Sequence, residues 1–212
     1  MMRLSPQYRY DIVKRALDII GASIALVVTA PMQLVVAGAV AVQLGRPVLF
    51  RQERPGLNGR IFTLRKFRTM RNVSLAHGLV SDDERLTRFG RILRATSMDE
   101  LPTLFNVVKG DMSMVGPRPL LVRYLSRYSS LENRRHEVRP GITGLAQVSG
   151  RNSLSWSRKF QLDVEYVDHR TFALDTSIVF RTLRSVVRRE GVTAEGNAAM
   201  PEFEQGVQNV ST

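Results

Sequence analysis

Residues 91–119 read RILRATSMDELPTLFNVVKGDMSMVGPRP, and the rest of the chain is organised around this stretch. It contains two adjacent carboxylates, Asp99 and Glu100, and later Arg118 between two prolines. The approach to the carboxylates is strongly basic, with arginines at a three-residue spacing: Arg85, Arg88, Arg91 and Arg94. Paired acids inside so basic a segment indicate a site that handles a phosphate with a metal ion and a carboxylate.

Composition limits the classes of protein to consider. A length of 212 residues predicts one globular domain with a core of its own. The net charge is +12, and residues 46–94 alone hold twelve basic against four acidic side chains. This excess favours an anionic partner, whether nucleic acid, a membrane surface or a phosphorylated substrate. The lack of cysteine excludes disulfides, thiolate zinc sites and cysteine nucleophiles.

Residues 19–45 form an apolar run without a charged side chain. As a helix, these 27 residues would extend roughly 40 Å, which is long enough for a membrane helix. Pro31 lies near the middle, where it kinks or breaks a helix because it removes a backbone hydrogen bond. Both flanks are basic, and basic residues favour the cytoplasmic side. We therefore expect a re-entrant helix that bends at Pro31 and returns, with a kinked single span or a soluble helical hairpin as alternatives.

Residues 46–70 are basic and irregular, and they predict short strands and turns. We expect strands at residues 48–50 and 61–64, separated by a turn rich in proline, glycine and asparagine. Lys66 and Arg68 follow on either side of Phe67. Their charges predict a patch that faces phosphate or the membrane surface, and a solvated basic face is the alternative.

The two carboxylates also have a purely structural interpretation. Residues 97–100 fit a capping box, in which Ser97 caps a helix and Glu100 bonds back to it. Proline is best tolerated in a first helical turn, so Pro102 makes Asp99 the alternative cap. Upstream, residues 86–94 predict a helix whose inward-facing side chains are Leu86, Phe89, Ile92 and Leu93.

Two helices are expected in the C-terminal third. Residues 155–170 carry an apolar stripe that predicts packing on the core: Trp156, Phe160, Val164 and Val167. Residues 174–190 combine an apolar face with arginines, so this helix either lies on an anionic membrane surface or packs on the domain. Residues 191–212 predict a loose tail, in which AMPEF at 199–203 is able to dock locally.

Four segments together resemble the bacterial sugar transferase family, the small monotopic phosphoglycosyl transferases that load polyprenol phosphate. They are KRALD at 14–18, KFRTM at 66–70, TSMDELPTLFNVVKGDMSMVGPRP at 96–119 and RPGITGLAQVSGRN at 139–152. The resemblance covers residues 8–190. One departure lies in the membrane run, where family members usually have Ser-Pro and this chain has Ala30-Pro31. The change removes a hydroxyl partner for the backbone carbonyls that proline frees.

The resemblance implies that a UDP-sugar gives its sugar-1-phosphate to undecaprenyl phosphate and releases UMP, which initiates a glycoconjugate. Asp99 is the implied nucleophile, and its aspartyl phosphosugar is resolved by the lipid phosphate. Mg²⁺ is the implied cofactor, with Asp99 and Glu100 as its ligands, and Glu100 would also help to activate the second substrate. We expect four basic residues to bind substrate phosphates, the first two because they match family positions: Arg94, Arg118, Lys66 and Arg68.

The resemblance also concerns the N-terminus, where Lys14, Arg15 and Asp18 match the family's first motif at the membrane interface. We expect Asp18 to pair with a nearby arginine, because a lone charge there is costly. The predicted fold is α/β, mainly helical with short strands: residues 1–45 form an arm and the re-entrant helix, 46–190 one compact catalytic domain and 191–212 the tail. The predicted location is the cytosolic face of the bacterial inner membrane, where the chain is monotopic.

The expected partners are a UDP-sugar, undecaprenyl phosphate and membrane lipid, and a family-like homodimer is left open. Residues 155–169 and the AMPEF segment look like those of members that use acetamido sugars. The rival class is a membrane-tethered basic protein that binds nucleic acid or anionic lipid without catalysis. We expect no nucleic-acid partner, because aromatic residues are sparse in the basic segments and no RNA-binding motif occurs. A scaffold without activity is a third alternative, and the intact Asp99-Glu100 pair argues against it.

Overall fold

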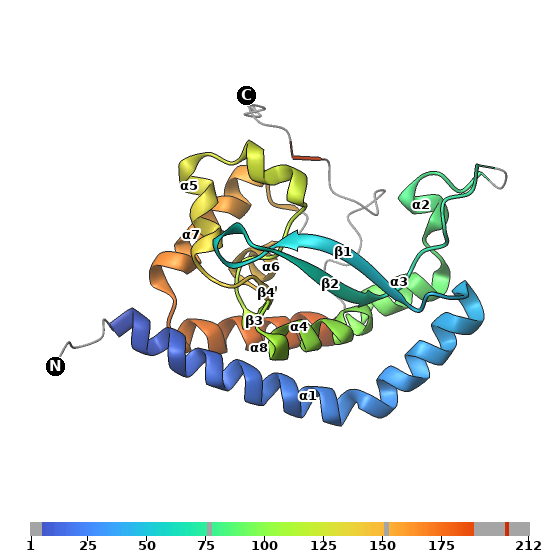
Figure 1. The fold of residues 1–212 in the computed structure, drawn as a ribbon, viewed down its shortest axis with the longest axis horizontal. Coiled ribbons are helices and arrows are strands. Elements are labelled where there is room, and N and C mark those ends of the chain that lie inside the picture. Colours follow the sequence, from blue (N-terminus) through green and yellow to red (C-terminus); the bar gives the residue numbers. More distant parts are fainter. Residues whose placement is uncertain (1–5, 76–77, 151–152, 189–201, 204–212) are drawn as a thin grey trace.

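The computed structural model describes the chain except for residues 1–5, 76–77, 151–152, 189–201 and 204–212. Helices dominate, and the strands pair into two separate two-stranded sheets (Figure 1). The α-helices are α1 (Pro6–Leu44), α2 (Asp82–Arg85), α3 (Arg88–Ala95), α4 (Leu104–Lys109), α5 (Ser130–Asn133), α6 (Leu145–Ser149), α7 (Trp156–His169) and α8 (Phe172–Arg188). Short 3-10 helices are η1 (Leu57–Gly59), η3 (Met98–Thr103), η4 (Val122–Arg127) and η5 (Arg134–Glu137). A mainly helical domain with short strands is confirmed.

The N-terminal part is one long helix, α1, which begins at Pro6, well before the apolar run. The helix continues through Pro31, so the expected break is a bend instead. Figure 1 shows α1 as a bow along one side of the molecule, with both ends turned toward the domain. Near the bend, the Thr29 hydroxyl donates to the Ala25 carbonyl at 2.6 Å, and the Gln33 amide donates to Thr29 at 2.9 Å. A hydroxyl that bonds to the preceding turn often accompanies a bent helix.

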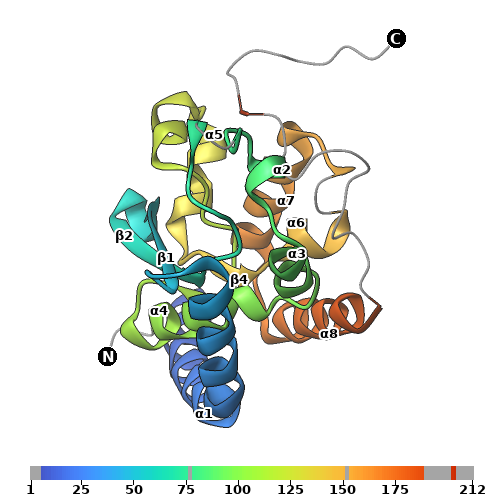
Figure 2. The ribbon, with the colours of Figure 1, turned by 90° about the vertical axis from the view of Figure 1, so that its right-hand side faces the viewer.

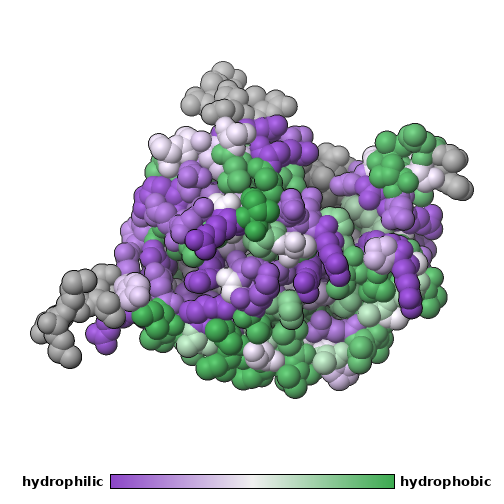
Figure 3. Space-filling model, viewed as in Figure 1, coloured by the Kyte–Doolittle hydropathy of each residue, from purple (hydrophilic) through white to green (hydrophobic). Residues whose placement is uncertain are grey.

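Most of the apolar surface of α1 is exposed. Only 11% of its most apolar window is buried inside the molecule, and by length and composition the helix could cross a membrane. Val27, Val28 and Val42 are exposed by 75, 72 and 87%. Figure 3 shows hydrophobic side chains gathered along this edge, below a hydrophilic band. Because exposed apolar area on this scale needs an apolar environment, α1 qualifies as a membrane anchor.

The two predicted strands are present and run further than expected. β1 (Leu49–Pro55) and β2 (Ile61–Phe67) form an antiparallel hairpin around η1. Asn58 adopts a left-handed backbone conformation in the turn (φ 53°), which asparagine tolerates better than most residues. Phe62 and Leu64 of β2 pack against Ala22 of α1 and Val107 of α4. The hairpin is thereby fixed over the middle of the N-terminal helix.

A second sheet was not predicted from the sequence. β3 (Ser113–Val115) and β4 (Gly141–Thr143) form a short parallel pair. The pairing requires glycine, since a Cβ added at Gly141 would lie 2.1 Å from the backbone nitrogen of Gly116. The predicted helices α7 and α8 cover this pair, with Tyr166 and Ile178 buried beside Val115. Figure 2 shows α7 and α8 on the same side of the molecule.

Two smaller predictions need correction or completion. Helix α3 begins at Arg88 after a Thr87 cap, and Ile92 is 60% exposed although it was expected to face inward. Leu93 is buried as expected. Phe203, within the AMPEF segment, is buried against the aromatic rings of Tyr124 and Phe160, which confirms local docking there. Apart from Glu202 and Phe203, the predicted tail lies outside the described residues.

Candidate active site

The β-hairpin, η3 and the loop after β3 bring three predicted site residues together. Oε1 of Glu100 accepts hydrogen bonds from Lys66 Nζ of β2 and from Arg118 Nη2, the latter at 3.0 Å. Asp99 lies next to Glu100 and is 8% exposed. We call Lys66, Arg94, Asp99, Glu100 and Arg118 the carboxylate centre.

Neither carboxylate caps a helix, so the expected capping box is wrong. Ser97 adopts a left-handed conformation (φ 55°) and makes no capping hydrogen bond through its side chain. Asp99 and Glu100 lie within η3, which also excludes Asp99 as the cap. Capping boxes of the predicted kind form instead at Ser81 and Ser129. Helix capping therefore does not account for the two carboxylates, and both are available for chemistry.

Two buried polar side chains hold η3 and α4 against β2. The Thr103 hydroxyl donates to the Arg65 carbonyl at 3.0 Å. The Asn106 amide donates to the Thr63 carbonyl at 2.8 Å and accepts from the Arg65 backbone N–H at 3.3 Å. Because Lys66 follows on the same strand, these bonds fix its position relative to Glu100. Sequence reasoning missed both residues, and the available signal was a polar side chain at an otherwise apolar helical position.

The two adjacent acids have opposite electrostatics. Burial raises the pKa of Asp99 to about 6, with the negative charge of Glu100 adding to the effect. Burial alone would also raise the pKa of Glu100, but the charges and hydrogen bonds of Arg118 and Lys66 outweigh it and lower that pKa to about 2. Glu100 is thus a fixed anion, whereas Asp99 is an unusually basic carboxylate. Such divergence is typical of active-site carboxylates.

Of the four predicted phosphate-binding residues, three belong to the carboxylate centre and one lies elsewhere. Arg94 donates through Nε to the Thr69 hydroxyl at 3.2 Å, and its charge acts on Asp99 by lowering its pKa. Lys66 and Arg118 lie at Glu100, as described above. Arg68 is placed elsewhere, where it lines a separate cavity with Val48 and Asn72.

Two further cations near Arg118 were missed by the sequence reasoning. Burial and the charge of Arg118 lower the pKa of Arg54 to about 10 and that of Lys159 to about 8. Arg54 also donates to the Pro119 carbonyl at 3.2 Å, while its Nε is buried without a hydrogen-bond partner. Cations whose pKa is lowered by burial and by a neighbouring positive charge are suited to bind an anion. The available signal for Arg54 was its place directly before a Pro-Gly turn.

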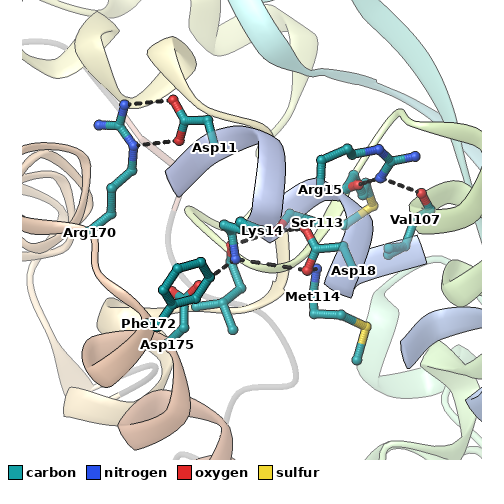
Figure 4. A network of polar contacts seen from close by, with 12 residues as sticks. Asp11, Lys14, Arg15, Asp18, Val107, Ser113, Met114, Arg170, Phe172 and Asp175 are labelled. Atoms are coloured by element: carbon teal, nitrogen blue, oxygen red, sulfur yellow. Dashed lines mark hydrogen bonds and ion pairs between the residues drawn. The ribbon is translucent and has the colours of Figure 1, made fainter. Parts of the chain in front are cut away.

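The predicted interface residues of α1 form a network with the domain, shown in Figure 4. Asp18 is buried and accepts from the Ser113 hydroxyl at 2.7 Å and from the Met114 N–H at 3.1 Å. Its charged neighbour is Lys14 at 3.8 Å rather than the expected arginine. Lys14 also pairs with Asp175 of α8 at 2.6 Å.

Arg15 completes this network from the same turn of α1. Its guanidinium donates to the carbonyls of Val107, Val108 and Met112 at 2.8, 3.1 and 3.3 Å, near the C-terminal end of α4. Cations are favourable at this end of a helix, where carbonyls lack partners. We call Lys14, Arg15, Asp18 and Asp175 the α1 clamp, because they fasten the anchor to α4, β3 and α8.

The donor set of the carboxylate centre limits how a metal could bind. Within the described part of the chain, no group of three histidine, aspartate or glutamate side chains could hold a metal ion. The pair Asp99 and Glu100 suits Mg²⁺ in its usual phosphoryl-transfer form, which takes one or two carboxylates together with substrate phosphates and waters. Glu100 already pairs with two cations, so Asp99 is the better placed of the two ligands.

Comparisons with known proteins place the chain among similar sequences. The family model for bacterial sugar transferase matches residues 9–189. The chain is 48% identical to an uncharacterized sugar transferase, EpsL, of Bacillus subtilis, over 91% of this chain and 96% of the other. It is 39% identical to the UDP-glucose:undecaprenyl-phosphate glucose-1-phosphate transferase of Caulobacter vibrioides, over 86% and 72% of the two chains. It is also 36% identical to the undecaprenyl-phosphate galactose phosphotransferase of Salmonella typhimurium, where it covers 84% of this chain and 41% of that one.

Proposed function

The chain belongs to the bacterial sugar transferase family, and on that basis we propose that it transfers sugar-1-phosphate from a UDP-sugar to undecaprenyl phosphate. The observation that carries the proposal is the pair of adjacent carboxylates with opposite pKa shifts, set among three cations. The names of two relatives include undecaprenyl phosphate as a substrate. One is a UDP-glucose:undecaprenyl-phosphate glucose-1-phosphate transferase, and the other is an undecaprenyl-phosphate galactose phosphotransferase.

Asp99 is the proposed nucleophile. A carboxylate oxygen attacks the β-phosphorus of the UDP-sugar, an O–P bond forms, and the bond to the leaving phosphate breaks so that UMP departs with the electron pair. The raised pKa of Asp99 makes the ionised carboxylate more nucleophilic than an ordinary one. In the second step an oxygen of the lipid phosphate attacks the same phosphorus and releases Asp99. The product is a lipid diphosphosugar.

The surrounding side chains supply position and charge. Lys66 and Arg118, already oriented by Glu100, are placed to bind the diphosphate oxygens on which charge accumulates during transfer. Arg94 acts on Asp99 from α3. Glu100 keeps these cations in place and would help to activate the lipid phosphate. Mg²⁺, held by Asp99 with Glu100 close by, would neutralise phosphate charge when bound.

The anchor sets the place of the reaction. Helix α1 would enter the bilayer, bend at Pro31 and return, so that both basic flanks stay on the cytosolic side. The α1 clamp then holds the carboxylate centre close to the lipid headgroups. Helix α8 contributes exposed Phe180 and Leu183 beside arginines, which suits a surface helix. We place the protein on the cytosolic face of the inner membrane.

The test is UMP release from a panel of UDP-sugars by the purified full chain, with and without undecaprenyl phosphate. We expect a stoichiometric burst of UMP without the lipid, sustained turnover with it, and a phosphosugar adduct at Asp99 found by mass spectrometry. The panel includes acetamido sugars, glucose and galactose, because the sugar preference is a prediction from resemblance alone. Absence of UMP release with every donor would favour the rival class, a basic membrane protein without catalysis.

A further inference from the structure

A cavity separate from the carboxylate centre lies at the connection between α1 and β1. Its volume is about 630 Å³, and none of its lining residues belongs to the carboxylate centre. We call it the Arg68 groove, and it is lined by Pro47, Val48, Leu49, Phe50, Arg51, Arg68 and Asn72. The lining is apolar along one run of four residues and cationic at two, which suits a ligand with an anionic head and an apolar chain.

Arg68 is buried in this groove without its full set of partners. It is 8% exposed, and its Nε and Nη1 atoms are buried with no hydrogen-bond partner. Its backbone N–H donates to the Val48 carbonyl at 3.0 Å, which holds the residue against the start of β1. Buried donors without partners are costly, because they have lost their hydrogen bonds to water and formed none within the protein. An anion bound in the groove would remove that cost.

The apolar wall of the groove is continuous with the anchor. Val48 and Leu49 pack against the same cluster as Val36 and Val40 of α1, and the helix itself ends at Leu44, just before the groove. Phe50 is 43% exposed at the groove. A lipid chain alongside the C-terminal half of α1 would therefore contact apolar side chains that share a cluster with the groove wall.

The groove is linked to the carboxylate centre through Thr69. Thr69 follows Arg68, and its hydroxyl accepts the hydrogen bond from Arg94 Nε at 3.2 Å. Arg94 in turn is one of the cations that act on Asp99. The groove's cation, Arg68, is therefore the immediate chain neighbour of Thr69, which bonds to Arg94 of the carboxylate centre.

We propose that the Arg68 groove binds the prenyl phosphate acceptor, with Arg68 on its phosphate monoester and Pro47–Phe50 against its first isoprene units. The inference rests on the proposed function and assigns the two substrates to different cations. Lys66, Arg94 and Arg118 serve the nucleotide-sugar, and Arg68 serves the lipid. The ping-pong order makes this separation testable, because the donor step needs no acceptor.

The kinetic experiment compares R68Q with R60Q, which removes an exposed arginine from the opposite end of the same hairpin. For R68Q we expect the KM for undecaprenyl phosphate to rise about tenfold or more, and the UMP burst without lipid to stay within about twofold of wild type. R68K, which keeps the charge but not the fork, should fall between the two. R60Q should change neither quantity. An unchanged lipid KM in R68Q, or an equal loss in its UMP burst, would overturn the proposal.

A binding experiment separates this proposal from the proposed function. The full chain in detergent is titrated with farnesyl phosphate, and inorganic phosphate and phosphatidylglycerol are added as competitors. We expect farnesyl phosphate to bind wild type at least about tenfold more tightly than R68Q, with both competitors much weaker. Equal competition by phosphatidylglycerol would make the groove a bulk-lipid site and refute the assignment. Arg68-dependent binding in a protein that never releases UMP would leave the groove intact and refute the reaction.

Discussion

The α1 clamp and the carboxylate centre both bury charged side chains, but they treat those charges differently. In the clamp, both oxygens of Asp18 accept hydrogen bonds and Lys14 lies between two carboxylates. In the carboxylate centre, Glu100 accepts both ion pairs and Asp99 lies beside it with a raised pKa. Removing one partner from a set of buried, matched charges destabilises a fold, whereas a carboxylate with a strongly shifted pKa is suited to react.

The largest expected effect is the loss of chemistry in D99N. The UMP burst should fall more than about 10³-fold, because the amide is not a nucleophile, while membrane association persists. The same variant should be more stable than wild type at pH 7 to 8. In the native state the pKa of Asp99 is raised from 3.8 to about 6, so keeping the carboxylate ionised costs up to about 3 kcal/mol above pH 6.

The pH dependence of this stability gain provides a control. Below the unfolded-state pKa the carboxyl is protonated in both the native and the unfolded state, so the advantage of D99N should vanish near pH 3.5. Chemical denaturation at several pH values measures it. If D99N kept an activity close to that of wild type, Asp99 would not be the nucleophile. If the stability gain of D99N did not depend on pH, it would not come from the cost of ionising Asp99.

The next effect separates the clamp from the chemistry. D18N replaces an oxygen that accepts from Ser113 or Met114 with an amide donor, so one buried partner is left unpaired. We expect the free energy of unfolding to fall by about 2 to 3 kcal/mol, with the UMP burst per folded molecule nearly unchanged. The matched control is D82N, which breaks an exposed pair with Arg85 and should cost less than about 0.5 kcal/mol. Equal effects of the two variants would show that the clamp is not a stabilising network.

A smaller effect concerns pH alone. Because the nucleophile must be ionised, the rate of the UMP burst should be flat above pH 6 to 7 and fall about tenfold per unit below pH 6. Glu100, with a pKa of about 2, stays ionised throughout that range and adds no second break. Rapid-quench measurements between pH 4.5 and 8 would show the profile. A break near pH 4 would mean that Asp99 behaves as an ordinary exposed carboxyl.

The smallest effect concerns the bend in the anchor. T29V removes the hydroxyl that bonds to Ala25 and accepts from Gln33, so we expect α1 to straighten slightly in liposomes. The chain has no cysteine, so spin labels on cysteines at exposed positions 12 and 42 would report the end-to-end distance directly. T176V removes the same kind of bond, to the Phe172 carbonyl of α8, and should leave that distance unchanged. If the distance between the two spin labels in T29V equalled that in wild type, Pro31 alone would account for the bend.

The sequence predicted the elements with long or regular apolar patterns. The exposed N-terminal helix, the β-hairpin and helices α7 and α8 all follow from runs of side chains that are close in the chain. The parallel pair of β3 and β4 was not predicted, because three-residue strands are too short to show periodicity. Their pairing also depends on the close approach of Gly116 and Gly141 across the sheet. The capping box at Ser97 failed because a left-handed turn there joins α3 to η3, and only the packed structure selects it.

What the sequence by itself determined is the presence of an apolar anchor bent at a proline and an Asp99-Glu100 pair within a family-specific basic stretch. Tertiary structure alone decided which cation meets which acid: Lys66 and Arg118 both pair with Glu100, Arg68 lies in its own groove two residues away from Lys66, and Lys14 rather than an arginine lies beside Asp18. The physical reason is range. Hydrophobic periodicity acts between neighbours along the chain, whereas pKa values and ion pairs depend on burial and on partners that packing brings from distant segments.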